Sequence, residues 1–245
     1  MTSQSLIGKA ALVTGGARRI GREIALELAA AGAEVTVTYR NSREDAERTI
    51  KAIQEIGRLA IAVKCDVCSE DSIREAMVAS VNFHGHLDLL VNNAAVFESV
   101  PLEQLRLDQW DAIFATNTRG PFLVAREAIP HLRKSQGRIV NIGSLGGLRA
   151  WADHAHYCAS KAALHMLTQA MAKSFAPDVA VNCVAPGWID FEEDGSELAA
   201  KHFAAKTPMR RNGSAQDVAQ AVVFFAAASS FITGQVLAVD GGLGL

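Results

Sequence analysis

The chain has 245 residues, of which 49% are hydrophobic and 20% charged, and its formal net charge is −2. This composition is ordinary for a soluble globular protein, and the near-neutral charge provides no basic surface of the kind that binds nucleic acid. The first five residues show no export signal, and no apolar stretch is long enough to span a membrane. We therefore expect a cytoplasmic protein with neither a nucleic-acid nor a membrane partner.

Strand-like and helix-like segments alternate along the chain. The expected strands are Ala10–Val13, Glu34–Tyr39, Leu59–Lys64, Asp88–Val91, Arg138–Asn141, Ala180–Val184 and Gln235–Val239. The expected helices are Gly21–Ala31, Arg43–Ile56, Glu70–Phe83, Leu107–Lys134, Tyr157–Phe175 and Ala215–Ala227. This alternation predicts the α/β class, with a seven-stranded parallel sheet and helices on both faces. We expect one doubly wound, Rossmann-like domain over residues 1–245, with ligands at the carboxyl ends of its strands.

A glycine-rich turn follows the first expected strand. Its sequence is Thr14-Gly15-Gly16-Ala17-Arg18-Arg19-Ile20-Gly21, and it leads directly into the first expected helix. Glycines let the backbone approach a pyrophosphate, and the start of the helix offers free N–H groups and the positive end of the helix dipole. The order strand, turn and helix predicts a dinucleotide site. The contacts expected from this turn are Gly15, Arg18, Arg19, Ile20 and Gly21.

The end of the second expected strand indicates which dinucleotide binds. It reads Tyr39-Arg40-Asn41-Ser42, and no acid occurs before Glu44. Sites selective for NAD place an acid here for the ribose 2′-hydroxyl, whereas basic residues accept a 2′-phosphate. The guanidinium groups of Arg40 and Arg18, with donors from Asn41 and Ser42, suit a phosphate dianion. We therefore expect NADPH/NADP+ as the cofactor.

Two residues in the fifth expected helix point to acid–base chemistry. Tyr157 and Lys161 are four residues apart, so the phenol and the ammonium group lie on one helix face, one turn apart. A phenol ordinarily has a pKa near ~10. A cation one turn away favours the phenolate, so we expect a lowered pKa for Tyr157 and a role in proton transfer.

The cysteine and histidine pairs do not predict a metal site. Cys65 and Cys68 form one C-x-x-C pair without a second, which favours a structural role. The pairs His84-x-His86 and His154-x-His156 lack a third ligand in a plausible position.

Several motifs together resemble those of the short-chain dehydrogenase/reductase family, over nearly the whole chain. They are the Thr14–Gly21 turn, Asp66-Val67, Asn92-Asn93-Ala94-Ala95, Asn117, Ser144, Tyr157-x-x-x-Lys161, Pro186-Gly187 and Val239-Asp240-Gly241-Gly242. The resemblance implies that Ser144 polarises a carbonyl and that Tyr157 donates a proton to its oxygen. It further implies that Lys161 holds the nicotinamide ribose and that Asn117 supports a proton relay through water. Cofactor contacts are also implied for Asp66, Val67, Asn93, Ala94, Ala95, Tyr157, Lys161, Pro186, Gly187 and Ile189.

The sequence is compatible with more than one class of substrate. Ser144 favours a ketone, such as the substrates of 3-oxoacyl-acyl-carrier-protein reductases. A pteridine reductase is favoured by Arg18-Arg19, in which Arg19 replaces the family's middle glycine, and by Phe191, which stands where most members have Thr. Against it, pteridine reductases tend to carry Asp in place of Ser144. A third alternative is a non-catalytic NADP-binding sensor, but such proteins usually lose the Tyr or the Lys.

Residues 188–209 interrupt the alternation of strands and helices. They contain the acids Asp190, Glu192, Glu193 and Asp194 and a short expected helix, Glu197–Ala205. The resemblance implies that this segment is a mobile lid over the substrate. It also implies a homotetramer, in which Leu107–Lys134 and Tyr157–Phe175 pair across a two-fold axis, and the apolar content of both stretches supports an interface.

Overall fold

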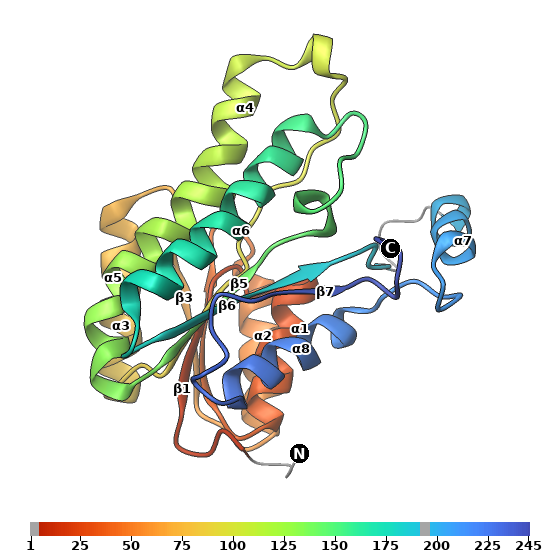
Figure 1. Ribbon diagram of the computed structural model, residues 1–245. Coiled ribbons are helices and arrows are strands. Elements are labelled where there is room, and N and C mark those ends of the chain that lie inside the picture. Colours follow the sequence, from red (N-terminus) through yellow and green to blue (C-terminus); the bar gives the residue numbers. More distant parts are fainter. Residues whose placement is uncertain (1–4, 192–196) are drawn as a thin grey trace.

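The computed structural model describes residues 5–191 and 197–245, which form an α/β fold around one parallel sheet (Figure 1). The order of its seven strands is β3-β2-β1-β4-β5-β6-β7, and every neighbouring pair is parallel. The strands are β1 (Ala10–Val13), β2 (Glu34–Tyr39), β3 (Ala60–Lys64), β4 (Leu89–Asn92), β5 (Arg138–Ile142), β6 (Ala180–Pro186) and β7 (Val236–Val239). Residues 1–4, expected to hold no export signal, and the lid acids Glu192, Glu193 and Asp194 lie outside the described residues.

Helices cover both faces of the sheet, which confirms the predicted fold class. On one face lie α1 (Arg19–Ala30), α2 (Arg43–Glu55) and α8 (Ala215–Ala227), and on the other lie α3 (Glu70–His84), α5 (Gly120–Ser135) and α6 (Ala155–Phe175) (Figure 1). Side chains alternate between the two faces: Ala11 and Val13 pack with α1 and α8, whereas Leu12 packs with α5 and α6. Two apolar cores therefore hold the sheet between its helical layers.

The expected helix Leu107–Lys134 is wrong as one element, because the chain forms three segments there. These are α4 (Leu107–Phe114), a π-helical turn (Ala115–Arg119) and α5. The wider π turn changes the direction in which its side chains project, and such turns often occur at functional sites. Gly120 and Pro121, which open α5, are the sequence signal for a new helix start. The turn contains Asn117, one of the expected catalytic residues.

The carboxyl ends of the strands bring the expected site residues to one edge of the sheet. The strand order reverses direction between β1 and β4, which is where ligands bind in doubly wound sheets. The segments that follow β1, β2, β4, β5 and β6 all lie at this edge, and α7 (Glu197–Lys206) lies beyond it (Figure 1). This geometry collects residues that are distant in sequence.

No helix within residues 5–191 and 197–245 has the length and apolar character needed to cross a membrane. The cellular compartment of the protein stays a prediction.

Candidate active site

The glycine-rich turn after β1 is tightly closed against β4. Gly15 has a φ of +62°, a conformation that glycine adopts without strain. A Cβ on Gly21 would lie 2.3 Å from the carbonyl oxygen of Gly15, so only glycine fits there. The amide of Asn93 donates to the carbonyl oxygens of Thr14 and Gly15, both at 3.0 Å. Asn93 therefore fixes the shape of the turn, and its expected contact with the cofactor stays a prediction.

Arg19 adopts a backbone conformation that explains why the related family prefers glycine at this position. Its φ is +52°, in the left-handed region that is costly for residues with a side chain. The guanidinium carbon lies 5.1 Å from the centre of the Phe191 ring, within the range of a cation–π contact. The Arg19 side chain thus extends toward the segment after β6.

Arg18, just before α1, and Arg40, just after β2, are both exposed. In α2, Glu47 pairs with Arg43 at 2.8 Å and Asp45 pairs with Arg48, and Glu44 also lies in the first turn of that helix. A closed glycine turn at a helix start fits the pyrophosphate of a dinucleotide.

Ser144, Tyr157 and Lys161 come together between β5 and α6. Ser144 precedes a short 3₁₀ turn, and its Oγ accepts a hydrogen bond from the Gly146 amide at 3.0 Å. The Ser144 hydroxyl lies near enough to the phenol of Tyr157 to favour its ionised form. The Nζ of Lys161 lies 5.9 Å from the centre of the Tyr157 ring and donates to the carbonyl oxygen of Ile142 at 2.8 Å. Two hydroxyl groups and one ammonium group thus share a small region.

The pKa values of this group differ from the expectation. Burial raises the pKa of Tyr157, and the neighbouring Ser144 hydroxyl opposes that rise without reversing it. The expected lowering by Lys161 is therefore wrong: spacing along the helix does not reveal how strongly burial disfavours the phenolate. Burial also lowers the pKa of Lys161 to about 8, because its ammonium group is almost fully enclosed.

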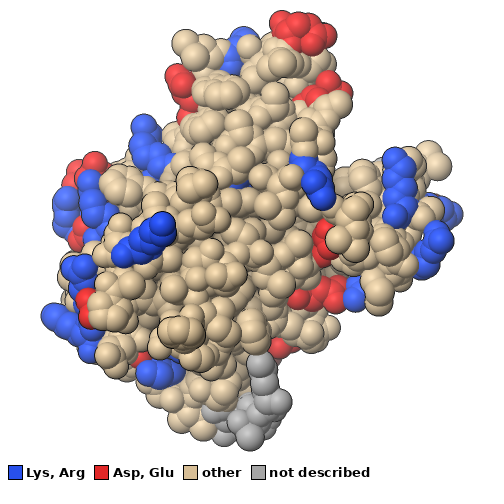
Figure 2. Space-filling view, viewed as in Figure 1, with Lys and Arg blue, Asp and Glu red and all other residues tan. Residues whose placement is uncertain are grey.

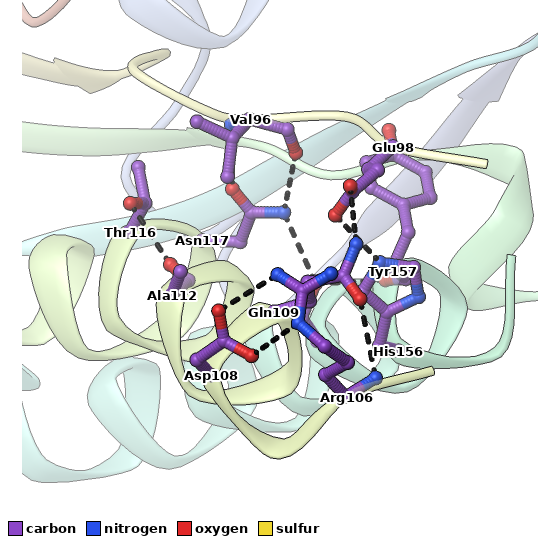
Figure 3. Close-up of polar contacts among 11 residues, drawn as sticks. Val96, Glu98, Arg106, Asp108, Gln109, Ala112, Thr116, Asn117, His156 and Tyr157 are labelled. Carbon is purple, nitrogen blue, oxygen red and sulfur yellow. Dashed lines mark hydrogen bonds and ion pairs between the residues drawn. The ribbon is translucent and has the colours of Figure 1, made fainter. Parts of the chain in front are cut away.

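Asn117 connects the loop after β4 to helix α6. Its Oδ1 accepts a hydrogen bond from the Val96 amide, and its Nδ2 donates to the Val96 carbonyl, both at 2.9 Å (Figure 3). The same Nδ2 donates to Ser160 Oγ at 3.1 Å, and this hydroxyl donates to the carbonyl of Tyr157 at 2.7 Å. Asn117 is fully buried, and its side chain holds the loop after β4 against α6. Its expected water relay stays a prediction.

Sequence reasoning missed His165, which lies directly behind Ser144. Its Nε2 accepts a long hydrogen bond of 3.4 Å from the Ser144 amide. A Cβ on Gly143 or Gly147 would lie 2.3 Å or 2.6 Å from the imidazole ring, so both glycines are needed for this packing. Burial and the charge of Lys161 lower the pKa of His165 to about 4. The signal in the sequence is its position one helical turn after Lys161.

The remaining expected cofactor residues lie at the same edge of the sheet. Asp66 Oδ1 accepts a hydrogen bond from the Cys68 amide at 2.9 Å, and the neighbouring Val67 is buried against Gly120. Cys65 belongs to the apolar core beside α3 and α5. Cofactor contacts of the following residues stay predictions: Ile20, Tyr39, Asn41, Ser42, Asp66, Val67, Ala94, Ala95, Pro186, Gly187 and Ile189.

The chain is similar to many known reductases and dehydrogenases. Residues 15–244 match a family model described as enoyl-(acyl carrier protein) reductase. A trihydroxynaphthalene reductase of Colletotrichum orbiculare is 38% identical, with 98% of this chain and 91% of the relative covered. A 3-oxoacyl-[acyl-carrier-protein] reductase of Staphylococcus aureus is 36% identical, with 96% and 98% covered.

Solved structures give the same result for the fold. A short-chain dehydrogenase/reductase from Serratia marcescens has a TM-score of 0.94 at 36% identity, with 99% of this chain and 100% of that chain covered. A blue fluorescent protein from a metagenomic library, solved in complex with NADPH, has a TM-score of 0.92 at 34% identity, with the same coverage.

Proposed function

The chain belongs to the short-chain dehydrogenase/reductase family and is an oxidoreductase of carbonyl and alcohol groups, and we infer that NADPH/NADP+ is its cofactor and a small-molecule ketone its substrate. The choice of NADP rests on Arg18 and Arg40, which flank the glycine turn, and on the absence of an acid from residues 39 to 43. The NADPH complex of a 34% identical protein supports this choice.

In the proposed reaction the cofactor transfers the hydride, and the side chains bind the cofactor and the substrate. When bound, the nicotinamide cofactor supplies or takes up the hydride. The helix start at α1 and the turn around Gly15 and Gly21 would hold its pyrophosphate, and Arg18 with Arg40 would hold the 2′-phosphate. Lys161 would hold the nicotinamide ribose.

The observation that carries the ketone proposal is the placement of the Ser144 and Tyr157 hydroxyl groups together beside Lys161, where β5 ends and α6 begins. Two such donors beside each other can bind one carbonyl oxygen and stabilise the charge that develops on it. Tyr157, whose pKa is raised by burial, keeps its proton until the oxygen becomes basic enough to take it. The Staphylococcus relative makes 3-oxoacyl thioesters the first open-chain ketones to test.

A pteridine reductase is the second candidate, because of the Arg19–Phe191 contact. A guanidinium group above an aromatic ring offers a flat surface that suits a flat heterocycle. Ser144 weighs against this candidate, since a hydroxyl suits a carbonyl oxygen better than a ring nitrogen. A third candidate, a non-catalytic NADP-binding sensor, has no need of the Tyr157 and Lys161 pair.

The deciding experiment measures NADPH oxidation side by side with a 3-oxoacyl thioester, a panel of simple ketones and dihydrobiopterin. Reduction of any ketone faster than of the pterin supports the proposed function. Activity on the pterin alone would replace it with the second candidate. NADPH binding without turnover on any compound would favour the sensor.

We also propose a homotetramer and a lid formed by residues 188–209. Exposed apolar side chains occur on α5 (Phe122), α6 (Met166) and β7 (Leu237). Figure 2 shows few charged residues in the middle of the face formed by α6, β6 and β7. Such a surface suits an interface between copies of the chain. In the lid, Trp188 stacks on Phe203 of α7 at 4.0 Å. Light scattering that gives a monomer at micromolar concentration would contradict the tetramer.

A further inference from the structure

Three aromatic side chains cluster with the phenol ring of Tyr157. We call Phe97, Trp151, His154 and Tyr157 together the aromatic wall. The ring centre of Phe97 lies 4.8 Å from that of Tyr157, with the ring planes perpendicular. Trp151 lies parallel to Tyr157 at 6.2 Å, and Phe97 stacks on His154 at 4.9 Å. Three of the four rings come from loops and have no part in the proposed proton transfer.

Phe97 is held firmly although it is largely exposed. Before it, Val96 is bound by both polar atoms of the Asn117 side chain. After it, Glu98 accepts a hydrogen bond of 2.6 Å from Gln109 (Figure 3). The chain before Phe97 is thus tied by its backbone to the π turn, and the chain after it is tied to α4 by the Glu98 side chain.

Further contacts tie the two loops of the wall to each other. The amide of Val100 donates to the carbonyl of Asp153 at 2.7 Å. Glu98 also lies 3.6 Å from the Nε2 of His156, a fully buried histidine next to Tyr157 (Figure 3). The loops that carry Phe97 and Trp151 are therefore held next to each other, and the Phe97 ring packs edge-on against the phenol ring.

The packing of the described chain does not account for this placement. Phe97 is 59% exposed, and the ring of His154 lies against it. Exposed aromatic surface is unfavourable in water, and a rigid loop that presents it beside a reactive group is typical of a ligand-binding surface. A flat ring gains most from stacking on such a surface, whereas a flexible open chain gains little from ring geometry.

We propose that Phe97 stacks on the substrate and that the substrate is a ketone whose carbonyl belongs to an aromatic fused-ring system. This inference rests on the proposed function, because it takes Tyr157 as the proton donor to a ketone. It restricts the proposed substrates to ring ketones and makes open-chain 3-oxoacyl thioesters poor substrates. Phe97 is then a specificity residue for the carbonyl reduction and takes no part in the proton transfer.

The test compares two ring ketones that differ by one benzene ring, 2-tetralone and cyclohexanone. The wild-type kcat/KM should be at least about tenfold higher for 2-tetralone than for cyclohexanone. Phe97→Leu should lower this preference by about three- to tenfold, the size of an aromatic stacking contribution. The loss should appear mainly as a higher KM for 2-tetralone, and it should exceed any change in the KM for cyclohexanone. Phe97→Tyr, which keeps the ring, should retain the preference.

The control is Phe231→Leu, because Phe231 is 97% exposed and outside the wall, and it should change neither substrate's kinetics. Melting temperatures establish that the variants are folded. An unchanged preference in Phe97→Leu, or a wild type that prefers acetoacetyl coenzyme A to 2-tetralone, would overturn the inference and leave the proposed function standing. A wild type that reduces no ketone at all would overturn both.

Discussion

The ammonium group of Lys161 donates a hydrogen bond to the carbonyl oxygen of Ile142, the last residue of β5, over 2.8 Å. This contact fixes the lysine at the carboxyl edge of the sheet, below Tyr157. The lysine is only 3% exposed, and the neighbouring Cys183 is buried as well. A buried ammonium group that keeps a single carbonyl partner loses its proton readily, which gives a direct test of its role.

We predict that NADPH affinity falls as the pH rises through about 8, the lowered pKa of Lys161. Below that pH the lysine is charged and can hold ribose hydroxyl groups as a cation; above it the charge is lost. Titrations of NADPH binding between about pH 7 and pH 10 would measure this. Lys161→Ala should bind NADPH more weakly at neutral pH and show a flatter pH dependence. A variant with the same pH dependence as the wild type would refute the role of Lys161.

Tyr157→Phe should reduce turnover by a factor of about 100 or more, the usual contribution of a general acid. The variant lacks only the phenolic hydroxyl, so the ring contacts with Phe97 and Trp151 should remain. Steady-state turnover with the best ketone gives the measurement. Unchanged NADPH affinity and melting temperature are the controls. Near-normal turnover would mean that another group donates the proton.

Arg40→Ala should weaken NADPH binding at least about tenfold, or ~1.4 kcal/mol, because it removes a charged partner of the 2′-phosphate. NADH has no such phosphate, so its affinity should change little. Dissociation constants for both cofactors provide the measurement. Arg43→Ala is the matched control, since that guanidinium group already pairs with Glu47. Equal wild-type affinities for NADPH and NADH would contradict the assignment.

The sequence predicts the fold well because its signals are local. β1 and β2 begin and end where the expected strands Ala10–Val13 and Glu34–Tyr39 do. The π turn was missed because its cause is tertiary: the Asn117 side chain is held by Val96 and Ser160, which belong to other segments. The only sequence signal near this turn is Gly120-Pro121, which indicates that a new helix begins there.

Sequence patterns could predict neither the raised pKa of Tyr157 nor the aromatic wall. Helical spacing placed Tyr157 beside Lys161 but could not reveal that burial raises the pKa of the phenol. Phe97 and Trp151 lie in loops, whose paths depend on contacts such as that between Val100 and Asp153. Their only sequence signal is the presence of large aromatic residues after two parallel strands, where ligands bind.

His165 should make the folded protein less stable in mild acid. Its pKa is lowered to about 4 in the folded protein, below the ordinary histidine value of 6.5, so between these values the unfolded chain binds a proton that the folded chain does not. The free energy of unfolding therefore falls as the pH decreases from about 6.5 to about 4, by on the order of 3 kcal/mol for this group. His165→Gln, a neutral side chain that can still accept a hydrogen bond from the Ser144 amide, should lose that part of the pH dependence. Urea unfolding at about pH 7 and about pH 4.5 measures the difference, with the exposed His202→Gln as control. If His165→Gln kept the full acid dependence of the wild type, His165 would not be the buried neutral histidine that supports Ser144.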